Sequence, residues 1–250
     1  MKSLLVFYAF FLTAVAGFGQ SGLNYYETGI GAGFSYQRGY TNITRQYSQF
    51  GVNGNYIYFF NPYFPIEAET QIGRLSGGGS LPSQDQFGRE YHNLYGAIIL
   101  HGDIMLGVVI DYDDSRILNV LKNFYGGIGL GALYNNNHVT RYSIYRPPYP
   151  QPGYYKFPGE DRGLNLTIPL RFGYEFKIYY ADNIPRFFVD IGYIHSVVVG
   201  EGLDGYDDPA TKFKNNAPDQ YRQINITFKF SFGNFISYNK LIRPFNYSSW

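Results

Sequence analysis

The sequence predicts an all-β fold, an eight-stranded antiparallel up-and-down transmembrane β-barrel, and three observations support this prediction. Residues 164–177 alternate strictly, with a hydrophobic side chain at every even position and polar or small residues between them. Residues 222–233 repeat the pattern, with Ile or Phe at five alternate positions. Aromatic residues make up 20% of the chain, which is unusual for a soluble domain. A bilayer-spanning strand needs this alternation, because apolar side chains face lipid and polar ones face the lumen.

The composition limits the alternatives. The chain has no cysteine, so disulfide bonds and thiolate chemistry are both excluded. Its net charge of +1 gives no basic surface for nucleic acid, and we expect no nucleic-acid partner. The mean hydropathy is slightly negative, as a barrel allows, since its hydrophobic residues alternate with polar ones. The soluble alternative is a secreted β-sandwich, but strands in such domains are usually shorter, about 5–6 residues.

Residues 1–19 have the features of a secretory signal peptide. Lys2 is followed by an apolar run from Leu4 to Val15, which is too short to cross a bilayer as a helix. Small residues supply a cleavage site, and we expect cleavage before Gln20 or, as the alternative, after Ala16. The barrel then occupies residues 20–235, and residues 236–250 form a periplasmic C-terminal tail. The expected location is the outer membrane, with the signal peptide removed.

Eight segments alternate with the period of a strand: 27–37, 49–60, 65–75, 92–109, 124–134, 164–177, 187–199 and 222–235. Connections after odd strands are long, whereas the even-strand connections at 61–64 and 179–186 are short. Outer-membrane barrels have long external loops, short periplasmic turns and periplasmic termini, so this asymmetry orients the barrel. Residues 110–123 are the exception. There we expect a short amphipathic helix at the periplasmic interface, with Asp113 or Asp114 as its N-cap.

The side chains expected to face the lumen differ from strand to strand. The glycine runs 29–33 and 127–131 lie in the first and fifth strands, and their inward glycines leave room for larger neighbours. These runs do not bind a dinucleotide, since that needs a strand-to-helix turn. The ionisable residues at inward positions are Glu67, Glu69, His101, Asp103, Arg171, Glu175, Lys177, Asp190 and Lys229.

These nine residues are the best-defined candidate site. The interior of an eight-stranded barrel is only wide enough to be filled by side chains. Because an unpaired charge away from water is costly, we expect an interlocked polar plug. In it, Arg171, Lys177 and Lys229 each lie near at least one carboxylate. The protein is then a structural or accessory component. The alternative is a proton or ion path, which corresponds to a narrow channel or transporter for small solutes.

We expect no enzymatic activity and no catalytic, cofactor-binding or metal-binding residue. His92 and His195 lie near the outer rim, and Ser196 follows the second of them. Adjacent residues in a strand point to opposite faces, so His195 and Ser196 cannot act as a pair. The four histidines are scattered along the chain without the spacing of metal ligands.

Two segments carry candidate contacts for a protein partner. The external loop 142–161 contains five prolines, which favour an extended chain, and exposed tyrosines at Tyr149, Tyr154 and Tyr155. The alternative is that this loop packs over the barrel mouth. The next external loop is acidic, and we expect it to be solvated.

The C-terminal tail combines aromatic and cationic residues, which are common at interfaces: Tyr238, Lys240, Arg243, Phe245 and Trp250. The alternative is that the tail packs beneath the barrel. The expected partners are therefore outer-membrane lipid and a periplasmic or outer-membrane protein.

Several short motifs occur in a particular order along the chain. They are GIGAG at 29–33, Asn61-Pro62 followed by GRLSG at 73–77, IPLRFGY at 168–174, and DIGY at 190–193 followed by LDGYD at 203–207. In this respect the chain resembles the small outer-membrane β-barrels of the Bacteroidota. More distantly, it is similar to the small barrel of the type IX secretion and gliding machinery. The resemblance implies an anchoring or assembly role rather than transport. Such barrels commonly end on an aromatic residue, for which Phe235 would serve, although residues 236–250 follow it.

Overall fold

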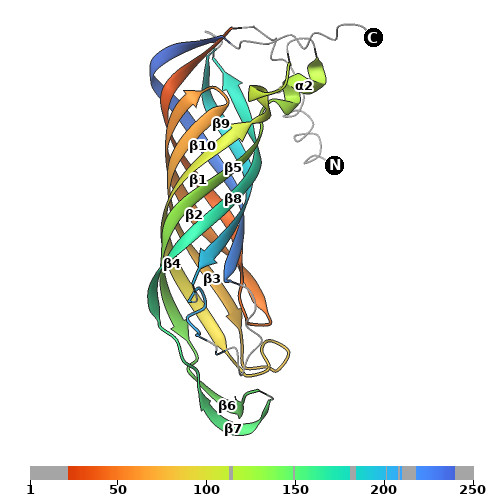
Figure 1. Ribbon diagram of the computed structural model, residues 1–250, viewed down its shortest axis with the longest axis vertical. Coiled ribbons are helices and arrows are strands. Elements are labelled where there is room, and N and C mark those ends of the chain that lie inside the picture. The colour runs from red at the N-terminus through yellow and green to blue at the C-terminus, as the bar shows by residue number, and fades with distance from the viewer. Residues whose placement is uncertain are drawn as a thin grey trace, which may run out of the picture.

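The computed structural model describes residues 22–112, 115–148, 150–180, 184–200, 202–207, 209 and 218–239. Eight long strands close into one barrel in the order β1-β10-β9-β8-β5-β4-β3-β2. Every neighbouring pair is antiparallel, so the predicted fold class is confirmed (Figure 1). The expected signal peptide at 1–19 lies outside the described residues, as do Tyr149, Lys240, Arg243, Phe245 and Trp250.

The barrel strands are β1 (Gly22–Tyr40), β2 (Gln46–Asn61), β3 (Phe64–Gly78), β4 (Glu90–Met105), β5 (Phe124–Val139), β8 (Arg162–Tyr179), β9 (Pro185–Val199) and β10 (Gln220–Asn239). All eight overlap predicted segments, and seven are longer than predicted. The prediction for the fourth segment, 92–109, is wrong at its end, because β4 stops at Met105 and residues 106–108 form a 3₁₀ helix. The eight strands contain 15–20 residues each, whereas about 9–11 suffice to cross a bilayer. The barrel wall therefore extends beyond the membrane.

Strand β10 is an example of a strand that extends beyond its predicted boundary. It continues to Asn239, past the expected end at Phe235. The added residues pair with the start of β1, where Tyr238 lies opposite Leu23 and Ile236 lies opposite Tyr25. The first part of the expected tail is thus a continuation of the barrel wall, held by backbone hydrogen bonds.

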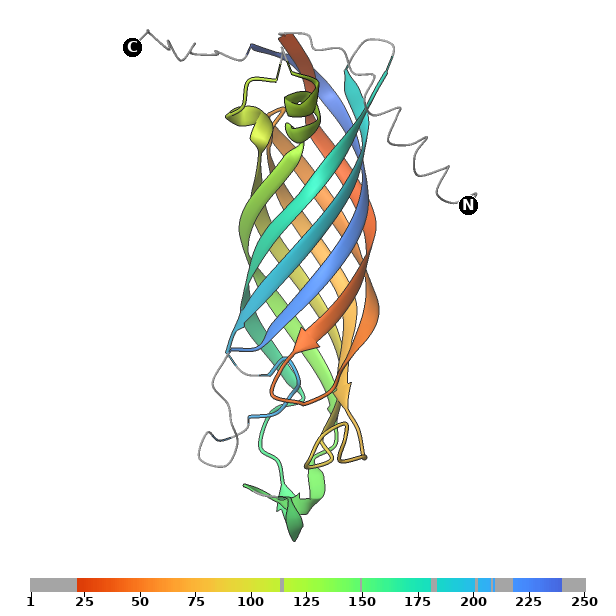
Figure 2. The same cartoon turned by 90° about the vertical axis from the view of Figure 1, so that its right-hand side faces the viewer.

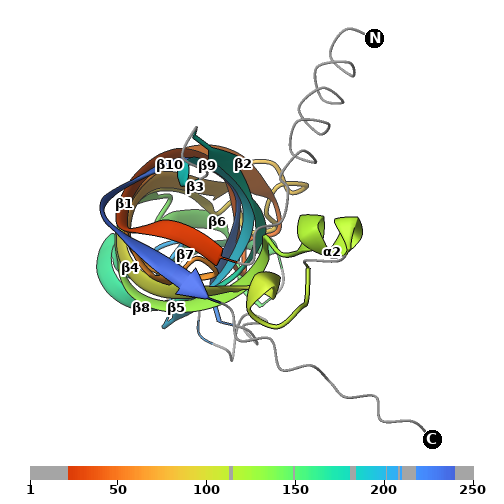
Figure 3. The same cartoon turned by 90° about the horizontal axis from the view of Figure 1, so that it is seen from above.

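The two ends of the barrel differ, as Figures 1 and 2 show, and we call the end with the short turns the periplasmic end and the opposite end the external end, following the orientation expected from the connection lengths. The short β2–β3 turn, the 3₁₀ helix η1 (Leu106–Val108) and helix α2 (Arg116–Leu121) lie at the end where β1 begins and β10 ends. Seen along the barrel axis, α2 lies beside the ring of strands (Figure 3). Its N-cap is Ser115, whose hydroxyl accepts from Leu118 N, and not the predicted Asp113 or Asp114, which lie outside the described residues. Neither helix of the described residues is long and apolar enough to cross a membrane.

The opposite end carries a small hairpin where a single extended loop was predicted. Strands β6 (Tyr142–Arg146) and β7 (Gln151–Lys156) form a separate two-stranded sheet that projects away from the barrel (Figure 2). The prolines at 147, 148 and 150 lie in the turn, so they do not interrupt the pairing of the flanking residues.

Candidate functional site

Alternating burial along the strands places the predicted ionisable residues inside the barrel. In β4, for example, Ile99, His101 and Asp103 are buried, whereas Leu100 and Ile104 are exposed on the outer wall. All nine predicted residues have their side chains in the lumen, including Lys177, whose side chain is 4% exposed. The residues come from β3, β4, β8, β9 and β10 and meet in the middle and at the periplasmic side of the barrel.

One group of charges surrounds Lys229. Its ammonium lies 2.5 Å from Glu67 Oε1, 2.9 Å from Asp190 Oδ2 and 3.3 Å from Glu175 Oε2. Lys177 lies closer to the periplasmic opening, where its ammonium is 3.8 Å from Glu175 Oε1 and donates to the carbonyl of Pro62 at 2.5 Å. The two lysines thus pair with carboxylates from three strands.

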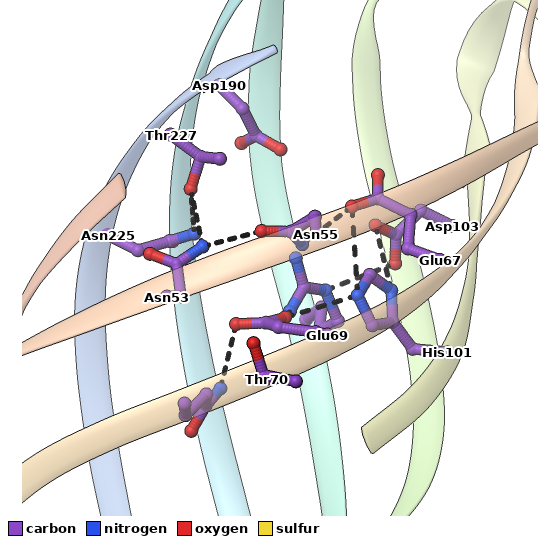
Figure 4. A network of polar contacts seen from close by, with 12 residues as sticks. Asn53, Asn55, Glu67, Glu69, Thr70, His101, Asp103, Asp190, Asn225 and Thr227 are labelled. Atoms are coloured by element: carbon purple, nitrogen blue, oxygen red, sulfur yellow. Dashed lines mark hydrogen bonds and ion pairs between the residues drawn. The ribbon is translucent and has the colours of Figure 1, made fainter. Parts of the chain in front are cut away.

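A second group surrounds Arg171. Its guanidinium donates to Glu69 Oε2 at 2.7 Å and lies 3.3 Å from Asp103 Oδ1. His101 lies between the same two carboxylates, with Nε2 at 3.2 Å from Glu69 and Nδ1 at 3.4 Å from Asp103 (Figure 4). Arg171, Lys177 and Lys229 therefore each have a carboxylate within salt-bridge distance, and the expected pairing is present.

Uncharged side chains donate to three of these carboxylates. Asn55 Nδ2 donates to Glu67 at 2.9 Å, Gln71 Nε2 donates to Glu69 at 2.9 Å, and the Tyr125 hydroxyl donates to Asp190 at 2.8 Å. Toward the external end a neutral layer follows, in which Gln223 Nε2 donates to Gln37 Oε1 at 2.8 Å and to the Tyr95 hydroxyl at 2.9 Å. Because each charge has more than one partner, none can move without breaking contacts to other parts of the barrel.

The inward glycines fit closely against these polar side chains. At Gly33 a Cβ atom would lie 2.5 Å from the carbonyl oxygen of Ile226 and 2.6 Å from Thr227 Oγ1. At Gly127 it would overlap the carboxylate of Asp103. The absence of a side chain at these positions therefore makes room for the network, as the sequence predicted.

The external mouth contains an apolar cluster that the sequence analysis missed. Inward residues of the strands pack there against residues of the external loops: Ile43, Leu75, Phe87, Tyr91, Tyr95, Ile99, Leu133, Phe157, Leu203, Tyr206 and Tyr221. The signal in the sequence was the presence of hydrophobic residues on the inward parity of β3, β4 and β5, at Leu75, Tyr95, Ile99 and Leu133.

Residues 202–207, the mouth segment, fold into this opening. Asn93 Nδ2 donates to the carbonyl of Leu203 at 2.8 Å, and the Tyr206 hydroxyl lies 2.9 Å from the carbonyls of both Glu90 and Thr140. The expectation of a solvated acidic loop is wrong here, because Asp204 is only 2% exposed and accepts from Tyr206 N at 3.0 Å. Burial also raises the pKa of Tyr206 above its usual value.

The periplasmic opening holds a second aromatic cluster of Tyr63, Met105, Tyr112 and Tyr125. Tyr238, a predicted partner contact, packs against this cluster, with its ring centroid 6.2 Å from that of Tyr63. The Lys177 ammonium lies 4.9 Å from the Tyr63 ring centroid and so links the aromatic layer to the charges. This packing of Tyr238 corresponds to the alternative in which the tail lies beneath the barrel.

The other described partner-contact residues lie on the hairpin. Tyr154 is 74% exposed, and its ring stacks on that of Tyr142 at 5.6 Å. Tyr155 points the other way and packs against Phe157 at 5.2 Å, above the mouth cluster. The predicted tyrosines thus divide into an exposed one and one that fixes the hairpin to the barrel.

The outer wall is covered by exposed hydrophobic side chains on all eight strands, among them Phe34, Ile72, Ile98, Leu100, Ile128, Phe172, Ile191 and Phe228. Such a continuous apolar surface is far too large for a protein in water, whereas lipid covers it at no cost. The chain is an outer-membrane β-barrel. Tyr56, Tyr58 and Phe60 are exposed at the periplasmic side of this wall, and the Tyr174 and Phe176 rings lie 4.6 Å apart there, as expected of an aromatic girdle.

Solved structures with a similar overall fold are outer-membrane barrels of very low sequence identity. Ail, the attachment invasion locus protein of Yersinia pestis, is 13% identical with a TM-score of 0.40, over 82% of this chain and 99% of that one. Neisserial surface protein A is 8% identical with a TM-score of 0.39, over 82% and 97%. OprG from Pseudomonas aeruginosa is 11% identical with a TM-score of 0.33, over 86% and 100%. No protein-family model and no curated protein sequence matches the chain.

Proposed function

We propose that this protein is a non-conducting outer-membrane barrel that serves as an anchor or assembly partner for another protein. The observation that carries the proposal is the filling of the lumen in successive layers. An aromatic layer at the base is followed by the charge network, a layer of Asn and Gln side chains, and the apolar cluster at the mouth. The proposed anchoring role agrees with the resemblance to the small barrel of the type IX secretion and gliding machinery, and it includes no catalysis.

The energetics of the charge network support a closed lumen. A continuous water path requires Lys229 or Arg171 to leave its carboxylates, and removing one partner of a buried ion pair costs about 3–5 kcal/mol. Lys229 has three carboxylate partners and Arg171 has two. An open state would therefore be populated only rarely, because each step of about 1.4 kcal/mol lowers a population tenfold.

The exposed face of the β6–β7 hairpin supports a contact with a partner. Ile144 is 70% exposed and lies on the same side as the stacked rings of Tyr142 and Tyr154. Rigid aromatic side chains are frequent anchors of protein interfaces. A two-stranded sheet also leaves both of its outer edges free to pair with another strand. The hairpin is fixed at its base, where Ser143 Oγ donates to the carbonyl of Phe87 at 2.5 Å.

Liposome swelling tests the non-conducting part of this proposal. Purified barrel is reconstituted into liposomes, and swelling is followed after addition of arabinose or glycine. We expect liposomes that contain the barrel to swell at the same rate as protein-free liposomes. Insertion is verified by the heat-dependent gel mobility that is typical of folded barrels. Swelling that increases with the amount of inserted protein would instead establish the channel alternative.

Substitutions in the hairpin test the anchoring part. In the variant Tyr142→Ser/Ile144→Ser/Tyr154→Ser the exposed apolar face is removed, whereas Tyr180→Ser removes an exposed tyrosine at the opposite end of the barrel. Whole cells are treated with a cross-linker, and the barrel is purified. Specific cross-linked products of the barrel should disappear in the hairpin variant and remain in the Tyr180→Ser variant. Identical products from both variants would exclude the hairpin as the contact.

A further inference from the structure

A depression on the outer wall of the barrel has no role in the function proposed above. It has a volume of about 500 Å³ and lies across β2, β3, β4 and β5 near the external end. Leu94 forms part of its lining, together with the polar side chains of Arg74, His92, Asn136 and His138. Leu94 lies opposite Arg74 on β3 and opposite Asn136 on β5, and His92 lies opposite His138. Its lining also includes Leu75, Asn93 and Asn137, whose side chains point into the barrel. The exposed side chains of the lining all face outward, so the depression opens on the outer wall.

The depression lies where the outer wall changes from apolar to polar. On β3 the outward residue Ile72 is followed by Arg74, and on β5 Tyr134 is followed by Asn136 and His138. On β4 the change occurs between Leu94 and His92. The lining thus coincides with the boundary between the acyl chains and the headgroups of the outer leaflet.

The outer face of the neighbouring strand β8 also changes from apolar to polar near the external end. There Leu164 is 73% exposed, and the next outward residue toward the external end is Arg162. Arg162 Nε lies 3.4 Å from Asn136 Oδ1, so it extends the polar border of the depression by one strand. Four adjacent strands therefore share one boundary between apolar and polar surface.

Cations outnumber carboxylates at this border. Among the residues that the structure describes, the Arg74 guanidinium has no carboxylate partner. The carboxylate present is Glu90, whose Oε1 lies 3.3 Å from His92 Nε2. Asp161, which precedes Arg162, pairs with Arg141 at 2.5 Å. The guanidinium of Arg74 is thus a planar group of N–H donors at a lipid boundary, and no acceptor among the described residues occupies it.

Gly96 leaves a groove directly next to the depression. It lies on the outer face of β4, one outward position below Leu94, between Ile72 on β3 and Tyr134 on β5. The nearest atom to a Cβ built there is Gln71 O at 3.9 Å, so the position is open space between two large hydrophobic side chains. A groove of this kind accommodates an acyl chain, because the chain fills space that no side chain occupies.

We propose that this depression binds the phosphate group of a phosphorylated lipid in the outer leaflet, with one acyl chain of that lipid in the Gly96 groove. Arg74 donates to the phosphate in the fork geometry that favours phosphate oxygens, and Asn136 and the imidazoles of His92 and His138 supply further polar contacts. Basic pockets on the membrane-facing side of a protein are a general means of holding anionic headgroups.

Lipid binding by the full barrel tests the proposal. The barrel is reconstituted in phosphatidylcholine vesicles that contain a minor fraction of lipid A or of dephosphorylated lipid A, and bound lipid is measured by native mass spectrometry after transfer to detergent. We expect lipid A to bind preferentially, and Arg74→Gln to weaken this binding about tenfold, as the loss of a charge-assisted hydrogen bond predicts. The variant Gly96→Leu, which fills the groove, should weaken it as well.

The matched control is Arg222→Gln. Arg222 is also an outward arginine near the external end, but its guanidinium lies over the Tyr40 ring at 4.8 Å, and it does not line the depression. We expect no change in lipid A binding for this variant. Equal losses in both arginine variants would show diffuse charge attraction and overturn the site, as would equal binding of dephosphorylated lipid A. If inorganic phosphate in solution binds at the depression and lipid A does not, the site binds free phosphate and the lipid assignment is wrong. Each variant is first checked for folding by its heat-dependent gel mobility.

Discussion

Arg171 on β8 donates to Glu69 on β3 at 2.7 Å, although the two strands are not neighbours in the ring. The contact therefore spans the lumen and holds two parts of the wall together from inside. Arg171 is among the largest fully buried side chains of the described residues, and Glu69 is also in contact with His101 and Gln71. The strength of the barrel thus depends on its interior polar contacts as well as on its backbone pairing.

The loss of Lys229 should be strongly destabilising. The substitution Lys229→Met leaves Glu67, Asp190 and Glu175 without their shared cation, and uncompensated buried charges typically cost about 3–5 kcal/mol. We expect this loss in the free energy of unfolding, measured with urea in phosphatidylcholine vesicles. Lys156→Met, on the exposed hairpin, is the control and should change stability by less than about 0.5 kcal/mol. A neutral Lys229→Met would mean that the three carboxylates have other counterions.

The glycines of the wall should differ in their tolerance of a methyl group. Gly33→Ala places its Cβ against the backbone carbonyl of Ile226 and should destabilise the barrel by about 1–3 kcal/mol. Gly96→Ala faces open space on the outer wall and should be close to neutral. The difference between the two unfolding free energies is the measurement. Equal effects would contradict the close packing of the lumen around β1.

The loss of stability caused by an arginine on the lipid-facing wall should depend on the depth of the substituted residue in the bilayer. Leu170 lies in the apolar part of β8, and Leu170→Arg should cost about 2–4 kcal/mol if the residue is near the bilayer midplane. Leu164→Arg, beside Arg162 at the external border, should cost only about 0–1 kcal/mol. Reversible folding into vesicles gives both values. A larger penalty at Leu164 than at Leu170 would require the membrane boundary to be moved along the strand.

The mouth segment should loosen without the Tyr206 hydroxyl. Tyr206→Phe keeps the ring but removes the contacts to the carbonyls of Glu90 and Thr140, a loss of about 1–3 kcal/mol if they stay buried. We expect faster amide hydrogen exchange in residues 202–207 and unchanged exchange in the barrel strands. Since burial raises the pKa of Tyr206, the fold favours the neutral phenol. This contribution is present below the usual tyrosine pKa of about 10 and disappears only as the pH rises above it.

The alternation of residues along the chain predicted much of this structure. The features that it did not predict have specific physical causes. Strict parity in residues 164–177 identified β8 and placed Arg171, Glu175 and Lys177 in the lumen. Strand ends on the external side were missed because the outer face becomes polar beyond the lipid, as at His138 and Arg162, so the period-2 contrast disappears there.

The packing of the loops at the external mouth could not be predicted from local sequence patterns. Its contacts join residues that are far apart in the sequence, such as Asn93 and Leu203, and they depend on how the loops fold back over the barrel. The acidic residues around Leu203 suggested solvent exposure, but Asp204 is buried because the backbone N–H of Tyr206 satisfies its carboxylate. The lipid-facing depression was likewise hidden, because it brings together short segments of four strands that are far apart in the sequence.

Single-channel recording in planar bilayers tests the proposed closed lumen most directly. The wild-type barrel should insert without producing current steps. A triple variant with smaller side chains at the mouth and in the charge network, Tyr95→Ala/Arg171→Ala/Tyr221→Ala, should produce measurable steps if it still inserts, which shows that the assay detects an open lumen of this size. Steady current steps from the wild-type protein, scaling with the number of inserted molecules, would contradict the closed lumen and favour a narrow channel.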